Sequence, residues 1–504
     1  MSPENIVVIF AVVLGALWLF DHLRRRNGPK SPPGPPAFPI IGNLHLLGDL
    51  PHSNLRRLAQ KYGPIMSMRL GQVPTVVVST PAAAELFLKT HDLVFASRPR
   101  LQAPEYLSYG NKGVGFSQYG PYWRDVRRIC TVNLLSPGKI ESYGGLRKEE
   151  VGSLVRWLKE AAAAREVANV TVKLSVLMED ITCRMLFGRS RDERFELKKV
   201  VREFLFLTGS SNIGDFIPWL KPLDLQGLKR RMKATGKAFD SILEIMIDEH
   251  IRDGSGRSST GSHGDFMDMM LSLMNESQYS QDESLRIIDR TNIKAVLIDL
   301  LVGGTDSSSS TVEWAISELI RQPKLMRKLQ DEIKSVVGKK EFVDEADLPR
   351  MAYLDNVVKE TLRLHPVSPL LAPHESTEDI TINGYFIPKK SRILVNAWAI
   401  GRDPSAWPNS PEEFNPERFV GSEVDLQGRD FQLIPFGSGR RACPGMRLGL
   451  TTVRLVLAHL AHCFDWELPG GVSPSKLDMS QKFAGLVSPR AHPLLAVPVY
   501  RFQS

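Results

Sequence analysis

One cysteine close to the C-terminus stands in a setting that suits a metal ligand. Cys443 lies in the segment 436–445, F-G-S-G-R-R-A-C-P-G, where glycines flank it and Arg441 precedes it by two positions. Gly445 and its neighbours can offer backbone N–H groups to the sulfur with no side chain in the way. Arg441 adds the positive charge that haem propionates need. A lone cysteine is more often a buried structural residue, but these neighbours favour a thiolate ligand for haem iron.

A second segment holds side chains that could act beside such a centre. The sequence G-G-T-D-S ends with Asp306 and Ser307. It fits a helix that stops at the glycines, followed by another helix with Ser310 as N-cap and Glu313 closing a capping box. It also fits one long helix over residues 294–318, although two interior glycines cost about 2 kcal/mol.

Composition describes an ordinary globular chain with an ample core. The 504 residues are 42% hydrophobic and 24% charged, and the net charge is +8. That charge weakly favours an acidic partner or an anionic membrane surface, and no nucleic-acid motif accompanies it. The four cysteines are too few and too scattered for a disulfide framework, which indicates a reducing compartment; they are Cys130, Cys183, Cys443 and Cys463.

The N-terminus predicts a retained membrane anchor. An apolar run covers residues 6–20, with Glu4 before it and three arginines at 24–26. A cleaved signal peptide carries its positive charge before the apolar run, and the positive-inside rule keeps these arginines cytosolic. We therefore expect an anchor over 1–23 with a luminal N-terminus. The sequons at Asn169 and Asn275 should then carry no glycan.

The rest of the chain predicts a mainly helical fold with a small β subdomain. Helical periodicity covers residues 148–160, 174–187, 228–250, 311–337 and 446–461. Residues 66–70 and 73–79 predict a hairpin, and 380–386 and 393–396 predict further strands. Residues 252–265, rich in Ser, Gly and charge, predict a surface loop.

The cysteine loop resembles the haem-binding signature of the cytochrome P450 superfamily. Residues 435–441 and 414–419 are similar to plant A-type members, and the resemblance extends over essentially the whole chain. It implies the cytochrome P450 fold, preceded by a single N-terminal transmembrane helix. It also implies a basic, proline-rich hinge over 24–40 and a haem-thiolate monooxygenase domain over 41–504.

The resemblance assigns roles to residues that would otherwise read as ordinary. Glu360 and Arg363, three positions apart on one helix face, are by themselves most often a weak surface pair. In the family they form a buried network with a later arginine, here Arg418, which lies 25 residues before Cys443. The resemblance also favours the single long helix over 294–318.

On that helix Asp306 and Ser307 match the acid–alcohol pair that delivers protons during dioxygen activation. The alcohol is usually threonine, and serine lacks the methyl group that restricts χ1. The haem contacts that the family implies are Trp123, Arg127, His374, Phe436, Arg441, Gly445 and the iron ligand Cys443. His374 stands where relatives commonly have arginine, and it carries full charge only when protonated.

Alignment with the family implies an apolar substrate pocket. Its expected members are Leu101, Phe116, Leu301, Gly303, Val367, Leu371 and Leu486. They indicate a lipophilic plant specialised metabolite, with a terpenoid favoured and a phenylpropanoid or flavonoid next.

Electrons must come from another protein, because no G-x-G-x-x-G dinucleotide motif lies between a strand and a helix. The implied donor is the NADPH–cytochrome P450 reductase at the endoplasmic reticulum membrane, with cytochrome b5 as a second candidate. Basic residues predict a positive face that steers such a donor; they are Arg124, Arg127, Arg128, Arg440, Arg441 and Arg447.

Two other classes compete with a monooxygenase. A haem-thiolate isomerase or dehydratase needs no reductase, but such relatives typically lose the distal alcohol and alter the cysteine loop. A membrane-anchored gas-binding haem protein needs neither the acid–alcohol pair nor an apolar pocket. Ser307 and the intact loop around Cys443 favour the monooxygenase.

Overall fold

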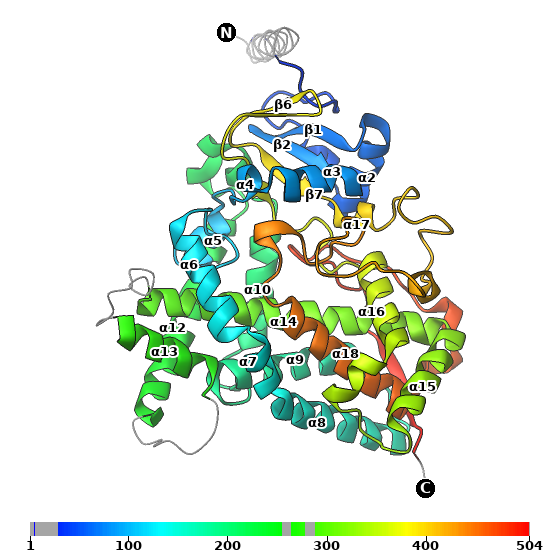
Figure 1. Cartoon of the computed structure of the whole chain (residues 1–504). Helices are drawn as coiled ribbons and strands as arrows, with labels where there is room; N and C mark the ends of the chain where they lie inside the picture. The colour runs from blue at the N-terminus through cyan, green and yellow to red at the C-terminus, as the bar shows by residue number, and fades with distance from the viewer. Residues whose placement is uncertain (1–4, 6–28, 255–263, 278–287, 503–504) are drawn as a thin grey trace.

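A long helix, α14 (Arg290–Arg321), runs through the middle of the molecule, and the other elements are arranged around it (Figure 1). The computed structural model describes residues 5, 29–254, 264–277 and 288–502. α14 packs chiefly against α9 (Val170–Phe187) and α18 (Met446–Cys463). The other longer helices of the described chain are α2 (Pro51–Tyr62), α6 (Pro121–Ile129), α8 (Gly144–Ala163), α10 (Leu197–Gly209), α12 (Leu228–Gly254), α13 (Phe266–Ser277), α15 (Pro323–Val337) and α16 (Ala352–Leu364).

Shorter helices join these elements. They are α3 (Pro81–Glu85), α4 (Asp92–Phe95), α5 (Gln102–Leu107), α7 (Pro137–Ser142), α11 (Ile213–Phe216) and α17 (Ala397–Ile400). The predicted mainly helical fold with small β elements is therefore confirmed.

α14 is continuous through Gly303 and Gly304, so the interpretation with two helices is wrong. Tertiary packing outweighs the low helix propensity of the glycines, because most of the helix surface is buried. A Cβ on Gly304 would lie 3.0 Å from the Thr182 hydroxyl of α9, so a small residue is needed for this packing. Glu313 closes no capping box; it accepts a hydrogen bond from the Thr171 hydroxyl at 2.5 Å.

The single helix predicted over 311–337 is instead two helices. α14 ends at Arg321, and α15 begins at Pro323. Gln322 between them has φ −124° and ψ 76°, outside the helical region. The proline ring disfavours a helical residue before it and offers no N–H, so periodicity alone could not reveal the break.

A four-stranded sheet lies near the N-terminal end of the described chain (Figure 1). Its order is β1 (Ile65–Leu70), β2 (Val73–Val78), β7 (Arg392–Val395) and β4 (His374–Glu375). β1 and β2 form the predicted hairpin, and β7 runs parallel to β2. The remaining strands are β3 (Ala168–Asn169), β5 (Ile380–Ile382), β6 (Tyr385–Ile387), β8 (Phe464–Glu467) and β9 (Leu495–Tyr500).

β5 and β6 are joined by a two-residue turn at Asn383 and Gly384, with φ of 51° and 75°. Positive φ at both positions is what this type of hairpin turn requires. The segment 380–386 is thus strand material, as predicted, and it folds as a hairpin.

The apolar run of the predicted anchor, residues 6–20, lies outside the described residues. Among the helices that are described, none combines the length and apolar character needed to cross a bilayer.

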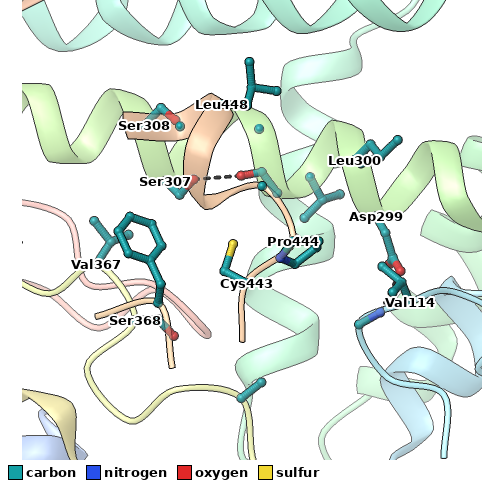
Figure 2. A pocket seen from close by; sticks show the side chains of 18 of the residues that line it. Val114, Asp299, Leu300, Ser307, Ser308, Val367, Ser368, Cys443, Pro444 and Leu448 are labelled. Atoms are coloured by element: carbon teal, nitrogen blue, oxygen red, sulfur yellow. Dashed lines mark hydrogen bonds between the residues drawn. The ribbon is translucent and has the colours of Figure 1, made fainter. Parts of the chain in front are cut away.

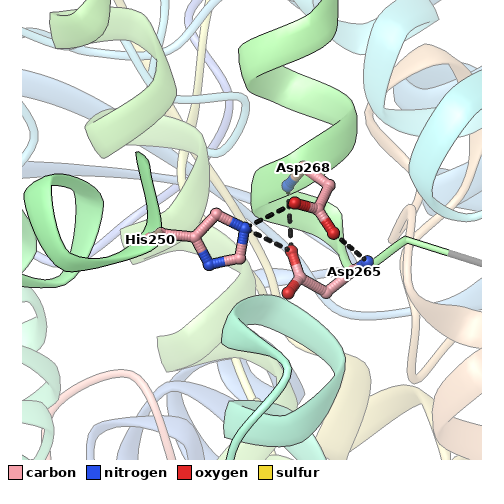
Figure 3. Close-up of side chains that lie close together, drawn as sticks. All are labelled: His250, Asp265 and Asp268. Atoms are coloured by element: carbon pink, nitrogen blue, oxygen red, sulfur yellow. Dashed lines mark hydrogen bonds and ion pairs between the residues drawn. The ribbon is translucent and has the colours of Figure 1, made fainter. Parts of the chain in front are cut away.

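A cluster of titratable side chains ties α12 to α13 (Figure 3). The Asp265 and Asp268 side chains accept each other's backbone N–H at 2.9 and 3.0 Å, which is a capping box at the start of α13. His250 of α12 lies 2.6 Å from the Asp268 carboxylate. Hydrogen bonds within the cluster thus account for all three side chains.

Candidate active site

A cavity of about 420 Å³ lies between α14 and the segment that carries Cys443 (Figure 2). Ser307 projects from α14 on one side, and the Cys443 sulfur faces the cavity from the other. The lining is mainly apolar, and it includes Val114, Phe116, Met178, Met185, Leu300, Val302, Val367, Leu371, Leu486 and Val487.

The backbone of the cysteine loop holds the thiol at the cavity wall. The Cys443 N–H donates to the Phe436 carbonyl at 2.8 Å. Gly439 has a φ of 67°, and a Cβ there would lie 2.3 Å from the Leu88 carbonyl oxygen, so only glycine is tolerated. Gly445 is the N-cap of α18, and a short turn over Gly439–Arg441 precedes the cysteine.

The surroundings of the Cys443 thiol both raise and lower its pKa. Burial from bulk water raises this pKa above its ordinary value. Backbone hydrogen bonds from Gly445 and Met446, and the charge of Arg127, act in the opposite direction. The sulfur is thus open to the cavity but remote from bulk solvent, with donors already aimed at it.

Three arginines line the cavity without any carboxylate in ion-pair contact with them among the described residues. They are Arg98, Arg127 and Arg441. Burial, followed by the other two arginines, lowers the pKa of Arg441 to about 8, and burial lowers the pKa of Arg98 to about 9. Uncompensated buried cations are costly, so this cluster is suited to an anionic ligand.

Backbone carbonyls fix the orientation of these guanidinium groups. Arg441 donates to Ala96 at 2.6 Å and to Ser117 at 2.5 Å, and its guanidinium carbon lies 4.0 Å from the Trp123 ring centroid. Arg98 donates to the carbonyls of residues 372 and 373 at 2.7 and 2.9 Å.

Sequence reasoning missed Arg98. The only signal was a charged residue two positions after the apolar stretch 93–96, and such a residue is usually exposed.

Trp123 and His374 line the same cavity, but their N–H groups are engaged by the backbone. The Trp123 indole donates to the Val114 carbonyl at 3.0 Å. His374 Nδ1 lies 2.8 Å from the Phe95 carbonyl, which requires the proton on that nitrogen. Burial, and then the charge of Arg98, lowers the pKa of His374 well below its ordinary value. The neutral ring therefore presents an acceptor at Nε2.

The two members of the predicted acid–alcohol pair on α14 differ in position, because Ser307 lines the cavity and Asp306 does not. The Ser307 hydroxyl donates to the Gly303 carbonyl at 2.7 Å, and both residues line the cavity (Figure 2). Nothing lies within 4 Å of where a Gly303 Cβ would be. Asp306 is not among the lining residues; burial raises its pKa, and the nearby charges of Arg202 and Lys198 partly offset this.

Five of the seven predicted pocket residues line the cavity: Phe116, Gly303, Val367, Leu371 and Leu486. The other two, Leu101 and Leu301, do not. Leu301 is fully buried in the hydrophobic core, because its position on α14 points away from the cavity face. Leu101 caps the start of α5 and is half-buried there. The Ser488 N–H donates to the Val367 carbonyl at 2.8 Å, which joins two of the lining loops.

Glu360 and Arg363 of α16 form a fully buried pair, with Nε–Oε2 of 2.6 Å and Nη2–Oε1 of 2.9 Å. Arg418 donates to the same carboxylate at 3.0 Å, and so does the backbone N–H of Asn415 at 2.6 Å. Both arginines also donate to the carbonyl of Glu413. The group thus connects α16 to the segment 409–418.

Comparisons with known proteins agree with this geometry. A family model described as Cytochrome P450 matches residues 32–495. Cytochrome P450 CYP736A12 of Panax ginseng is 56% identical over 99% of this chain and 100% of its own length. Cytochrome P450 71A1 of Persea americana is 45% identical over 87% of this chain and 88% of its own. A solved zebrafish cytochrome P450 structure with abiraterone has a TM-score of 0.73 at 26% identity and covers 90% of this chain and 100% of that one.

The chain belongs to the cytochrome P450 family, and its relatives place it with the plant A-type members. It is a monooxygenase whose cofactor is haem. The described residues fit that cofactor, because a cavity-facing thiol with backbone donors lies opposite α14 and an unpaired arginine cluster can take the propionates.

Proposed function

We propose that this chain hydroxylates or otherwise oxidises a lipophilic plant specialised metabolite, with a terpenoid favoured and a phenylpropanoid or flavonoid next. The observation that carries the proposal is the mainly apolar cavity between the Cys443 sulfur and Ser307. One relative supports the second class: Flavonoid 3',5'-hydroxylase CYP75B138 of Crocosmia x crocosmiiflora is 39% identical over 99% of this chain.

In this proposal the Cys443 sulfur would bind the haem iron. A haem held by a thiolate supplies the dioxygen activation and C–H oxidation. The backbone donors at Gly445 and Met446 stabilise the thiolate, and Phe436 holds the cysteine through its carbonyl. Arg98, Arg127 and Arg441 bind the propionates. Trp123 supports Arg441 by stacking. His374 already donates from Nδ1 to the Phe95 carbonyl, so it can donate to a propionate from Nε2 only when both nitrogens are protonated.

Protons reach the reaction through α14. Asp306 faces the charged side chains of Lys198 and Arg202 rather than the cavity, so it exchanges protons on the solvent side. Ser307 presents its hydroxyl to the cavity while bonded to Gly303. A serine hydroxyl can rotate away from that carbonyl more freely than a threonine hydroxyl, because it lacks the branching methyl.

The proposal includes a membrane-bound setting. The anchor over 1–23 holds the protein in the endoplasmic reticulum membrane, the hinge over 24–40 follows, and the domain over 41–504 lies in the cytosol. Electrons come from NADPH through the cytochrome P450 reductase, with cytochrome b5 as a second donor. Arg124, Arg128 and Arg447 contribute to the positive face that such an acidic partner would meet.

Co-expression with a plant reductase tests the function directly. Microsomes supplied with a panel of terpenoids, phenylpropanoids and flavonoids should consume NADPH and incorporate ¹⁸O from labelled dioxygen into one product, read by mass spectrometry. Product formed without reductase or NADPH would indicate an isomerase or dehydratase. A normal carbon monoxide spectrum with no product from any substrate would favour a gas-binding protein.

A further inference from the structure

A groove of about 860 Å³ lies on the outer side of α9 and α10, apart from the cavity that contains Cys443. We call it the α9–α10 groove. Its lining includes Glu179 of α9, Lys198 and Arg202 of α10, and Arg231 of α12. Arg202 is exposed, so water reaches the groove. The proposed reaction has given no role to this groove so far.

Glu179 is the unusual side chain of the α9–α10 groove. It is only 6% exposed, and among the described residues its carboxylate takes part in no hydrogen bond or ion pair. By contrast, Glu203 in the same groove accepts from Arg231 at 2.8 and 2.9 Å. Burial raises the pKa of Glu179, and the charges of Arg191 and Lys198 partly offset this. A buried carboxylate without donors favours taking up a proton.

The packing of α9 along α14 shows where Glu179 lies relative to the central helix (Figure 1). Near one end of the contact, a Cβ on Gly304 would lie 3.0 Å from the Thr182 hydroxyl. Near the other end, the Thr171 hydroxyl donates to Glu313 at 2.5 Å. Residue numbers thus rise along one helix as they fall along the other, so the two helices are antiparallel. Glu179, almost one turn before Thr182, is therefore level with the turn of α14 that follows Gly304.

That turn of α14 carries the acid–alcohol pair. Burial raises the pKa of Asp306, and the charges of Arg202 and Lys198, which line the α9–α10 groove, partly offset this. After burial, the charge of Asp306 is among the influences that raise the pKa of Glu179, so the two carboxyl groups interact. Ser307, the next residue, presents its hydroxyl to the cavity of Cys443. A series of acidic and hydroxyl groups thus leads from the groove to that cavity.

We propose that Glu179 is the residue through which protons enter this series: it takes a proton from water in the α9–α10 groove and passes it to Asp306. The inference rests on the proton delivery proposed above for Asp306 and Ser307, and it adds the group that supplies them. In each transfer the O–H bond of the Glu179 carboxyl group breaks as an O–H bond forms on the Asp306 carboxylate. Groove water then protonates Glu179 again, and no electrons move.

The products of dioxygen reduction report on this supply of protons. Water formation takes up one proton for every electron, and so does hydrogen peroxide formation, but water needs twice as many of both per dioxygen. Superoxide takes up an electron and no proton. A slow proton supply therefore shifts the products from water toward peroxide and superoxide. The assay uses the haem-loaded protein with reductase and NADPH and no organic substrate, and it measures all three products per NADPH consumed.

Two substitutions at Glu179 separate its acidity from its shape. Glu179→Gln keeps the shape without the acid, and we expect it to form water about 10-fold more slowly. This is less than the about 10²- to 10⁴-fold that a proton donor at the reacting group contributes, because groove water can still reach Asp306 in part. Glu179→Asp keeps the acid on a shorter side chain and should lose less. Full water formation in Glu179→Gln with a loss in Glu179→Asp would mean that only the shape matters, and the proposal would be wrong.

Glu203→Gln is the matched control, because it removes another carboxylate of the same groove, one that is already paired with Arg231. It should leave the product ratio unchanged. Asp306→Asn separates this inference from the proposed function. If Asp306→Asn slows water formation and Glu179→Gln does not, the role of Glu179 is refuted and proton delivery by α14 stands. If neither variant slows it, proton delivery by α14 is refuted as well. A normal carbon monoxide spectrum shows that each variant is loaded with haem.

Infrared difference spectra of parent minus Glu179→Gln give a readout that is independent of turnover. Because burial raises the pKa of Glu179 above its ordinary value of 4.5, the parent should show a protonated-carboxyl band that persists above pH 4.5. The band should shift in D₂O, since groove water exchanges with this proton, and it should be missing from the variant. A Glu179 carboxylate that is fully ionised above pH 4.5 could hold no proton to pass on, and this result would overturn the proposal.

Discussion

Replacing Glu360 by alanine is expected to abolish haem incorporation rather than slow the enzyme. The carboxylate is completely buried and accepts hydrogen bonds from Arg363, Arg418 and the Asn415 N–H. Its removal leaves the Arg363 guanidinium buried without a counter-ion. Breaking a buried pair in this way costs roughly 3–5 kcal/mol, a large share of the about 5–15 kcal/mol that stabilises a typical domain.

The loss falls on the segment that leads to the cysteine loop, because the same arginines donate to the carbonyls of residues 410, 411 and 413. The assay is haem per purified protein, measured as the pyridine haemochrome, together with thermal unfolding followed by fluorescence. Glu196→Ala is the matched control: Glu196 and Lys199 are also an i, i+3 pair, but their side chains are 74% and 76% exposed. This control should lose less than about 0.5 kcal/mol and retain its haem. A Glu360→Ala protein with full haem content would refute the reasoning.

Four further outcomes are expected. Cys443→Ser should remove the long-wavelength Soret band of the reduced carbon monoxide complex, and its persistence would exclude this residue as the iron ligand. Arg98→Gln should release haem to apomyoglobin several-fold faster than the parent protein, since one of three cations is lost. The Ser307→Ala variant should release more hydrogen peroxide per NADPH consumed than the parent protein, and Ser307→Thr should release no more than the parent. An equal peroxide yield in all three proteins would mean that the hydroxyl has no role in proton delivery. The pKa of Asp299 is raised from 3.8 to about 6, so the folded protein binds this proton more tightly than the unfolded chain. The protonated side chain therefore stabilises the fold fully below about pH 4, and this contribution to the free energy of unfolding, about 3 kcal/mol, is lost as the pH rises through 6. In Asp299→Asn the free energy of unfolding should vary less with pH over this range.

The local sequence predicted those elements that are marked by a periodic hydrophobic pattern or by turn residues. The hairpin at residues 66–79 and helix α18 follow from alternation and from a 3.6-residue repeat. Local sequence failed where packing or a single proline decided the outcome. α14 continues through two glycines because α9 packs closely against it, and Pro323 divides what periodicity presents as one helix.

The residues of the candidate site differ in the same way in how well the sequence predicts them. Residues within one motif, such as Cys443 and its flanking glycines, could be found because their neighbours in sequence are also their neighbours in space. Leu301 was misplaced since the direction of a side chain on a buried helix depends on which neighbours cover each face. Arg98 and Asp299 belong to no motif, and only their surroundings distinguish them from ordinary charged residues.

The sequence by itself determined which reactive groups the protein carries: a thiol in its glycine-flanked loop, a carboxylate and two guanidinium groups for one network, and an alcohol beside two glycines. These depend on residue identity and short-range spacing, which the chain carries directly. The tertiary structure decided which charges lack partners and which side chains meet the cavity. Burial and long-range contact set the energy of a charge, and neither is encoded in any local stretch of sequence.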